Sequence, residues 1–287
     1  MARELGGGEV TVVGRLVGGL DCSTHLLAEV NRKLVLKRFK PGAVTARLEF
    51  ENLALALSGP VATPEPVALD EAGGWFGTPA LVMTALEGRP DLVPADPKQW
   101  ARQLATALAA VHETPVPELL SPRPEPIWKR WMPWVEPPDG QMKAITGAVR
   151  RLREAAGAEP VVFSHGDYHP GNLLFHEGEV SGVVDWLSAH LQPRHYDVAY
   201  CRKDLAVHPG GDLAEQFLGA YEAEVGIRLK DIALWDVLCG SRGMQYGRRW
   251  APSFEEMGVH ISGATIVGRS TAFVEEALAK ARLGRGS

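Results

Sequence analysis

Residues 164–175 read SHGDYHPGNLLF, and the tetrapeptide VVDW follows at residues 183–186. Largely apolar runs border these polar groups at residues 161–163, 173–175 and 180–184. Runs of this length are typical of buried strands. We therefore expect the strands to bring polar residues of both groups, above all Asp167 and Asp185, to one place. The pattern predicts a functional site around which the rest of the chain is organised.

Asp167, Asn172 and Asp185 form the set of side chains that phosphoryl transfer requires. One carboxylate orients the attacking hydroxyl and accepts its proton, while a second acid and an amide oxygen hold Mg²⁺ against the nucleotide phosphates. Four residues separate Asp167 from Asn172, as in the protein-kinase catalytic loop, and Asp185 follows a predicted hairpin, as the metal-binding Asp does there. The spacing therefore favours a kinase chemistry.

The chain before this site is predicted to form a small antiparallel sheet with one helix. Lys37 lies inside an apolar strand, so it needs an anionic partner if it points inward, whereas the alternative is that it faces solvent. Glu49 is preferred to Glu51 as that partner because Leu53 and Leu57 share its side of the predicted helix; the alternative is a solvated glutamate. The expected strands are 9–17, 24–30, 34–39, 64–69 and 79–86, and the expected helix is 44–57.

Gly18 and Gly19 lie in a turn between the first two predicted strands, with Ser23 and Thr24 after them. Glycines let the backbone approach a ligand closely, and the hydroxyls and amides of such a turn suit phosphate oxygens. A plain hairpin turn is the alternative.

The chain beyond residue 88 is predicted to be mostly helical. Asp96 and Pro97 are typical of a helix start, and that helix should end near His112, which we interpret as a packed or capping residue. The Trp-rich stretch 115–138 either lines a substrate pocket or docks onto the core. Further helices are expected at 142–156, 212–225, 231–250 and 262–283. Pro252 and Gly258 should interrupt the helical structure before the last of them.

Composition limits the partners. The 287 residues are 45% hydrophobic, enough for one large domain or two lobes, and the formal net charge of -5 disfavours nucleic acid. No apolar run approaches the ~20 residues that span a bilayer, and the start lacks the apolar core of a signal peptide. We therefore expect a small-molecule partner, no membrane and a cytoplasmic location. Three scattered cysteines indicate ordinary thiols.

The chain resembles the aminoglycoside phosphotransferase/choline kinase family of small-molecule kinases. The residues that carry the resemblance are HGDYHPGN at 165–172 and Asp185-Trp186, supported by Lys37, Glu49 and the Gly18-Gly19 turn. It implies an α+β, bilobal, protein-kinase-like fold, with a small antiparallel N-terminal lobe containing one helix (1–87) and a larger, mostly helical C-terminal lobe (88–287). It also implies that ATP or GTP and Mg²⁺ bind between the lobes.

The same resemblance implies a role for each site residue. Asp167 would be the catalytic base and His165 would brace its loop, which Asp197 would tether from the next helix. Asn172 and Asp185 would be the metal ligands. The remaining positions would contact the nucleotide: Lys37 its α- and β-phosphates, Glu49 as the ion-pair partner of Lys37, Gly18, Gly19, Ser23 and Thr24 near the phosphates, and Met83, Thr84 and Leu86 near the base.

The acceptor is less determined. An aminoglycoside-like antibiotic, with resistance as the role, is the first expectation, and choline, a sugar or an amino alcohol is the alternative. The run Arg242 to Arg249 either contacts an anionic or neutral polyol or forms a solvated helix face. Two other classes are a nucleotide-binding protein without catalysis and a hydrolase whose metal is held by His165, Asp167 and His169. Either a monomer or a homodimer is expected.

Overall fold

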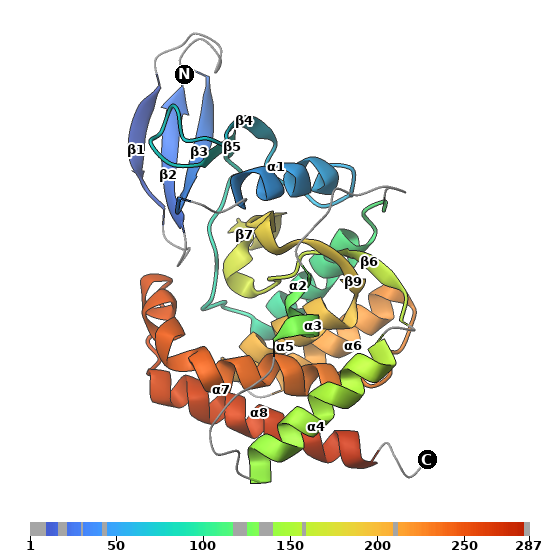
Figure 1. The fold of residues 1–287 in the computed structure, drawn as a ribbon. Helices are drawn as coiled ribbons and strands as arrows, with labels where there is room; N and C mark the ends of the chain where they lie inside the picture. The colour runs from blue at the N-terminus through green and yellow to red at the C-terminus, as the bar shows by residue number, and fades with distance from the viewer. Residues whose placement is uncertain are drawn as a thin grey trace.

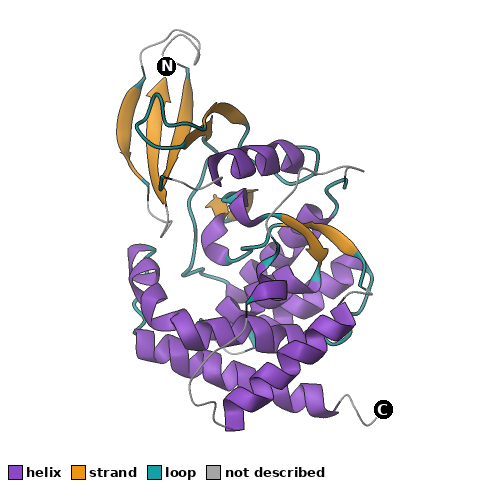
Figure 2. Ribbon diagram, viewed as in Figure 1, coloured by secondary structure: helices purple, strands orange, loops and turns teal. Residues whose placement is uncertain are grey.

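The computed structural model describes residues 10–16, 22–29, 31–41, 45–116, 125–131, 140–156, 159–208 and 212–283. Figure 1 shows a strand-rich N-terminal part above a helical C-terminal part, and Figure 2 shows how completely helices dominate the latter. The expected α+β class, with one N-terminal sheet and a helical remainder, is confirmed. The boundary at residue 87 stays a prediction.

The N-terminal part is a five-stranded antiparallel sheet in the order β1-β2-β3-β5-β4. Along β3, Leu34 and Leu36 point to one face, where they pack with Leu27 and Val82. Lys37 and its alternate neighbours therefore point to the other face, toward the C-terminal part, and not to solvent. The strands are β1 (Thr11–Arg15), β2 (Cys22–Glu29), β3 (Arg32–Phe39), β4 (Pro66–Asp70) and β5 (Ala80–Thr84).

The helix α1 (Thr45–Ala56) crosses between the sheet and the C-terminal part. Glu49 and Leu53 are fully buried on one side of it, as the sequence predicted. Leu57 was expected on that side too, but it follows the end of the helix and is 42% exposed. The N–H of Leu57 still bonds to the carbonyl of Leu53 (3.0 Å), so Leu57 is exposed because the chain leaves the helix directly after it, toward Gly59 and Pro60.

The C-terminal part is built from α2, whose predicted start and end are confirmed, and from the helices that pack around it. Asp96 accepts hydrogen bonds from the backbone N–H groups of Lys98 and Gln99 (both 3.0 Å), and Pro97 is the first helical residue. The helices are α2 (Pro97–His112), α3 (Ile127–Arg130), α4 (Gly140–Ala155), α5 (His195–Val207), α6 (Leu213–Val225), α7 (Ile232–Glu256) and α8 (Gly263–Leu283).

Two antiparallel two-stranded sheets, one of them a hairpin, hold the central motif. The predicted hairpin is formed by β7 (Leu173–His176) and β8 (Glu179–Val183), and its turn residues Glu177 and Gly178 both have positive φ, as a tight two-residue turn requires. The strand β6 (Val161–Ser164) pairs with β9 (His190–Pro193), which the sequence did not predict. Only four residues long, β9 is defined by its partner and not by an apolar pattern of its own.

The expected break at Pro252 is wrong, because α7 continues through it to Glu256, whereas Gly258, with φ +85°, follows the end of α7 as predicted. Proline costs a helix a backbone hydrogen bond. Phe254, two residues further on, is buried with Leu92, Val207 and Ile266, and this packing outweighs the local preference.

The Trp-rich stretch lies partly outside the described residues, Trp134 included. Trp128 is buried against Trp235 with ring centroids 5.3 Å apart, which favours docking onto the core over lining a pocket for this residue. Cys22, Cys201 and Cys239 are free thiols, as expected. Among the helices in the described ranges, none is long and apolar enough to cross a membrane.

Candidate active site

The loop between β6 and β7 carries the central motif into the space between the two parts of the molecule. Gly166 has φ +78°, and a Cβ atom at this position would lie 2.0 Å from the carbonyl oxygen of Ser188. Both the left-handed backbone and the close approach require glycine there. His169 caps the 3₁₀ helix η2 (Pro170–Asn172) by accepting a hydrogen bond from the N–H of Gly171. The His169 cap fixes residues 169–172 locally, whereas the position of Gly166 also depends on its approach to Ser188.

His165 braces this loop, as the resemblance implied. Its Nε2 lies 2.9 Å from the carbonyl oxygen of Val184, and its Nδ1 lies 3.3 Å from the backbone nitrogen of Asp167. The Nδ1 atom accepts from an N–H group, so the proton is on Nε2. Burial lowers the pKa of His165, which keeps the ring neutral. Both ring nitrogens are occupied, so His165 has no lone pair to offer a metal, and this contradicts the hydrolase hypothesis.

Asp197 on α5 holds the loop between β6 and β7 in place through its backbone. Its carboxylate accepts the backbone N–H groups of His165 (2.7 Å) and Gly166 (2.8 Å). His112 of α2 donates to the same carboxylate through Nε2 (3.1 Å), and its Nδ1 contacts the hydroxyl of Tyr221 (2.7 Å). The packed interpretation of His112 is therefore confirmed, and the ring links three helices to the loop.

Asp167 points into the cleft and is half-buried. Burial alone would raise its pKa, but His169, the hydroxyl of Tyr200 and His165 outweigh burial and hold the pKa below its usual value. Asp167 is therefore ionised at neutral pH and able to accept a proton. Nδ2 of Asn172 donates to the backbone carbonyl of Asp167 (3.0 Å), which leaves the amide oxygen as the free end of that side chain.

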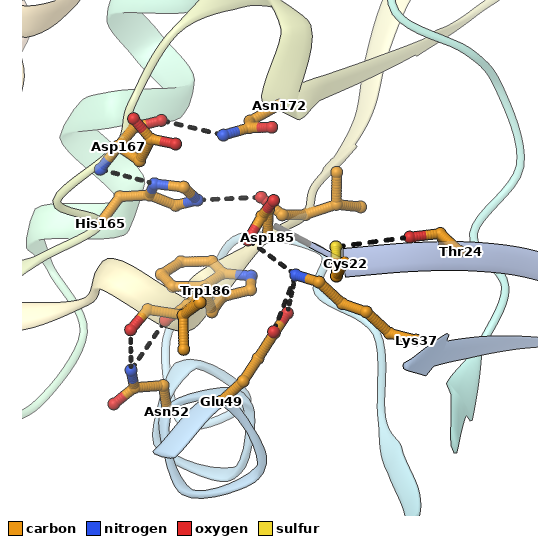
Figure 3. Close-up of polar contacts among 12 residues, drawn as sticks. Cys22, Thr24, Lys37, Glu49, Asn52, His165, Asp167, Asn172, Asp185 and Trp186 are labelled. Atoms are coloured by element: carbon orange, nitrogen blue, oxygen red, sulfur yellow. Dashed lines mark hydrogen bonds and ion pairs between the residues drawn. The ribbon is translucent and has the colours of Figure 1, made fainter. Parts of the chain in front are cut away.

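Lys37 connects the two parts of the molecule at the opposite side of the site (Figure 3). Its Nζ lies 2.7 Å from Glu49 and 2.8 Å from Asp185. Burial would lower the pKa of Lys37, but the carboxylates of Asp185 and Glu49 outweigh it and raise the pKa above its usual value. The Lys37–Glu49 pair that the sequence predicted is present, and Glu49 is the partner instead of Glu51.

Asp185 takes a left-handed backbone conformation with φ 65°. This conformation is uncommon outside glycine, although Asp tolerates it better than most residues. The side chain is 33% exposed and lies between Lys37 and the loop that carries Asn172 and Asp167 (Figure 3). Trp186, directly after it, is fully buried and stacks on Phe163 at 5.8 Å, which anchors the turn.

Asp185 and Asn172 fit a magnesium ion. Carboxylate and amide oxygens are the hard ligands that Mg²⁺ prefers, and Mg²⁺ is usually held by one or two protein groups plus nucleotide phosphates. The amide oxygen of Asn172 is left free by its Nδ2 hydrogen bond, and the Asp185 carboxylate is open to the cleft. In the described ranges no group of three or more His, Cys, Asp or Glu side chains could hold a metal by itself.

A cleft of about 2340 Å³ runs between the two parts. A pocket for one drug-sized ligand measures roughly 300–1000 Å³, so this cleft has room for a nucleotide and an acceptor together. Its lining includes Thr24, Met83, Thr84 and Leu86 of the predicted nucleotide contacts, together with Lys37, Glu49, Asp167, Asn172 and Asp185. Ser23 is not among the lining residues, because alternate residues of β2 point to opposite faces. Gly18 and Gly19 lie outside the described residues.

Two residues of the lining were not singled out by the sequence. Tyr200 lies one helical turn after Asp197, a spacing that places both on the same side of α5, so helical periodicity was a usable signal. Arg242 belongs to the run 242–249 for which two interpretations stood open. Arg242 lines the cleft, whereas Arg248 and Arg249 are exposed, so the run divides between the two.

Several known proteins are similar to this chain, and three of them illustrate the range. A homoserine kinase from Methylobacterium nodulans is 25% identical over 213 residues, which cover 68% of this chain and 64% of that protein. The chain thus spans less than two thirds of the length of this curated relative. The solved structure of a thermostable mutant of aminoglycoside phosphotransferase APH(4)-Ia matches with a TM-score of 0.67 at 14% identity, covering 96% and 97% of the two chains.

The ethanolamine kinase of Plasmodium vivax matches with a TM-score of 0.58 at 13% identity, over 96% of this chain and 82% of that one. One APH(4)-Ia structure is a ternary complex with AMP-PNP and hygromycin B. Likeness at these identities shows the fold, which is the expected kinase-like one. The family model of the phosphotransferase enzyme family matches residues 13–235, a span that includes the loop of Asp167 and the turn of Asp185. The chain therefore belongs to the phosphotransferase enzyme family.

Proposed function

We propose that this protein transfers the γ-phosphoryl group of ATP or GTP to a hydroxyl group of a small molecule. The observation that carries the proposal is that two acids with different partners line one cleft. Asp167 is ionised and lies beside an amide, while Asp185 lies beside a lysine that is itself held by Glu49. A proton acceptor and a phosphate-binding group then face the same space.

The side chains divide the work of the reaction. Asp167 orients the acceptor hydroxyl and takes its proton as the oxygen attacks the γ-phosphorus. The bond between that phosphorus and the bridging oxygen of the β-phosphate breaks, and the nucleoside diphosphate leaves with the electron pair. Lys37 holds the α- and β-phosphates, and Glu49 keeps the lysine in place. The backbone of residues 83–86, with Met83, Thr84 and Leu86, meets the nucleobase.

Asn172 and Asp185 would hold Mg²⁺, which supplies charge neutralisation on the phosphate oxygens when it is bound. Lys37 contacts the carboxylate of Asp185, so the groups that would bind the phosphates and Mg²⁺ lie together, and the acceptor hydroxyl would lie next to the carboxylate of Asp167.

For the acceptor we favour a primary metabolite over an aminoglycoside-like antibiotic. Two curated relatives, from Methylobacterium nodulans and Methylobacterium radiotolerans, are homoserine kinases, each 25% identical. Homoserine thus joins choline, sugars and amino alcohols as acceptors to test. The antibiotic, with resistance as the role, is the second candidate because of the likeness to APH(4)-Ia. A cytoplasmic location and a monomer or homodimer stay predictions.

The test is a phosphate-transfer screen with the variant Asp167→Asn beside the parent. Loss of a general base lowers kcat by at least roughly 100-fold, and nucleotide affinity should be retained because Asp167 contacts the acceptor and not the nucleotide. Glu224→Gln, an exposed acid on α6, is the matched control. Unchanged turnover in Asp167→Asn would contradict the proposal. Nucleotide binding without turnover on any acceptor would favour the non-catalytic binding protein.

A further inference from the structure

The wall of the cleft next to Asp167 is built by α5 and α7, and it differs in chemistry from the rest of the cleft. Tyr200 and Lys203 come from α5, and Arg242 and Trp250 come from α7; all four line the cleft. None belongs to the elements that carry the predicted nucleotide contacts. This wall is therefore where an acceptor held against Asp167 would lie.

Arg242 is a cation without an ion-pair partner at this wall. One terminal nitrogen, Nη1, donates to the hydroxyl of Tyr196 (3.1 Å), and the guanidinium lies over the ring of Tyr200 at 5.3 Å. Its Nε is buried with no acceptor. Asp167 acts on it electrostatically, but among the described residues no carboxylate oxygen lies within ion-pair distance. Partly buried cations that are left in this state are costly unless a ligand supplies the counter-charge.

Arg202, on α5, shows how this protein treats an arginine that serves structure. It is 2% exposed, and its guanidinium contacts the carboxylates of Asp236 (2.9 Å) and Glu215 (3.0 Å) as well as the carbonyl of Ala214 (2.7 Å). That arginine is saturated by its own chain. Arg242 also lies among aromatic residues, but among the described residues no acid forms an ion pair with it, so its guanidinium is available to a molecule in the cleft.

Lys203 fills an aromatic box at the same wall. Its Nζ lies 3.9 Å from the ring centroid of Tyr200 and 4.6 Å from that of Trp250, and it forms an ion pair with Asp204 (2.8 Å). Aromatic boxes of this kind are how proteins bind ammonium and quaternary ammonium groups. Here the chain's own lysine occupies the box, and Asp204 neutralises it. A cationic acceptor therefore cannot bind between the rings of Tyr200 and Trp250, because Lys203 lies there, and it is repelled by the charge of Arg242.

We propose that the acceptor is a hydroxy acid, bound with its carboxylate on Arg242 and its hydroxyl on Asp167. Tyr200 fixes both ends, because its hydroxyl bonds to Asp167 while its ring lies under the guanidinium of Arg242. Lys203 excludes choline-like and polycationic acceptors from the aromatic box. This inference rests on the proposed phosphotransferase function and narrows it to one class of acceptor.

The test compares each hydroxy acid with its own carboxamide, which keeps the hydroxyl and the shape but removes the charge. The probes are homoserine, 4-hydroxybutanoate and glycerate, each against its amide, with choline and an aminoglycoside as cationic acceptors. In the parent protein kcat/KM should favour the best acid over its amide by roughly 30-fold or more, the range for a paired buried charge. In Arg242→Gln this ratio should fall toward one.

The ratio separates recognition from a general effect on the site. Damage to Asp167 or to the fold through Arg242→Gln lowers turnover of acid and amide equally and leaves the ratio unchanged, which would overturn the proposal. Arg249→Gln, on the same helix but exposed, should keep the parent ratio. Arg242→Lys, which retains the charge without the planar fork, should keep part of it.

Calorimetric binding of acid and amide to the protein loaded with ADP and Mg²⁺ needs no turnover. Phosphate transfer could fail with every acceptor while the acid still binds at least about 10-fold tighter than its amide, a difference of roughly 1.4 kcal/mol. That result would support the carboxylate site and contradict the proposed reaction. If the cationic acceptors bind and react better than all the acids, the carboxylate site is wrong while the phosphotransferase function stands.

Discussion

Glu49 shows at the scale of one residue how burial and charge compete in this site. Its carboxylate is fully buried and shares the single cation of Lys37 with Asp185. Burial raises the pKa of Glu49 from 4.5 to about 7, and Lys37 offsets only part of that increase. Two acids therefore share one lysine, and Glu49 is the one that takes up a proton as the pH falls to about 7.

This predicts a pH dependence that Glu49→Gln should remove. Because the pKa is higher in the folded protein than in the unfolded chain, the folded protein binds more protons between about pH 4.5 and 7. The contribution of Glu49 to the free energy of unfolding is thus fully present below pH 4.5 and is lost as the pH rises to about 7. Urea unfolding at about pH 5 and about pH 8 should show Glu49→Gln gaining about 2–3 kcal/mol relative to the parent.

Glu51→Gln is the control, since it lies on the same helix and keeps Glu49 and Lys37 unchanged. It should follow the parent across the same pH range. A difference between Glu49→Gln and the parent that does not change with pH would mean that Glu49 stays ionised when folded.

At the scale of elements, the packing of α7 on α8 decides what α7 presents to the cleft. Gly240, Gly243 and Gly247 lie on the side of α7 that faces α8, and a Cβ on any of them would meet α8 side chains at 2.3–2.7 Å. Small residues on one side let the helices approach closely, and Trp250 lies on that same side, near Gly243, whereas Arg242 lies on a different side; both line the cleft. The acceptor wall thus depends on glycines that touch no ligand.

Gly247→Ala should therefore destabilise the protein, whereas Gly268→Ala on α8 should stabilise it. The new methyl group of the first lies 2.7 Å from Ile266, while that of the second meets nothing within 4 Å. An exposed helical glycine costs roughly 0.5–1 kcal/mol relative to alanine, so Gly268→Ala should gain about that much. Overpacking at Gly247 should cost about 1–3 kcal/mol. Urea unfolding of both variants measures the two effects, and equal changes would contradict the close helix contact.

At the scale of the whole molecule, two of the contacts that join the sheet-bearing part to the helical part decide the position of Asp185. One is the ion pair of Lys37 with Asp185 (2.8 Å). The other is Asn52 of α1, fully buried, whose Nδ2 donates to the carbonyl of Trp186 (2.7 Å) and reaches that of Leu187 (3.3 Å). Both end on the turn that carries Asp185. The position of that acid is therefore determined by both parts together.

A nucleotide with Mg²⁺ bound in this cleft should stabilise the entire fold. At about 100 times its dissociation constant, a ligand that binds only the folded protein adds about 2.7 kcal/mol. Thermal unfolding with ATP and Mg²⁺ should show this gain, and Asp185→Asn should lose the part that depends on Mg²⁺ while Glu224→Gln keeps it. Equal stabilisation by ATP with Mg²⁺ and by ATP with EDTA in the parent would contradict the metal role of Asp185.

Local sequence was sufficient for the elements whose boundaries depend on local chemistry. The Asp96-Pro97 start of α2, the Glu177-Gly178 turn and the fold class follow from capping, turn geometry and apolar spacing. The spacing of Asp167, Asn172 and Asp185 indicated a kinase chemistry, because a catalytic loop keeps its working residues a few positions apart. The choice of Glu49 over Glu51 followed from helical periodicity.

Only the tertiary structure decided the features that depend on partners distant in sequence. The strand β9 exists because β6 pairs with it, α7 passes Pro252 because Phe254 is buried, and Asn52 joins two parts whose contact residues lie more than 130 positions apart. The uncompensated Arg242 beside the saturated Arg202 is of the same kind. In sequence both are arginines in mixed-charge segments, and which of them has an acid to pair with is determined by packing alone.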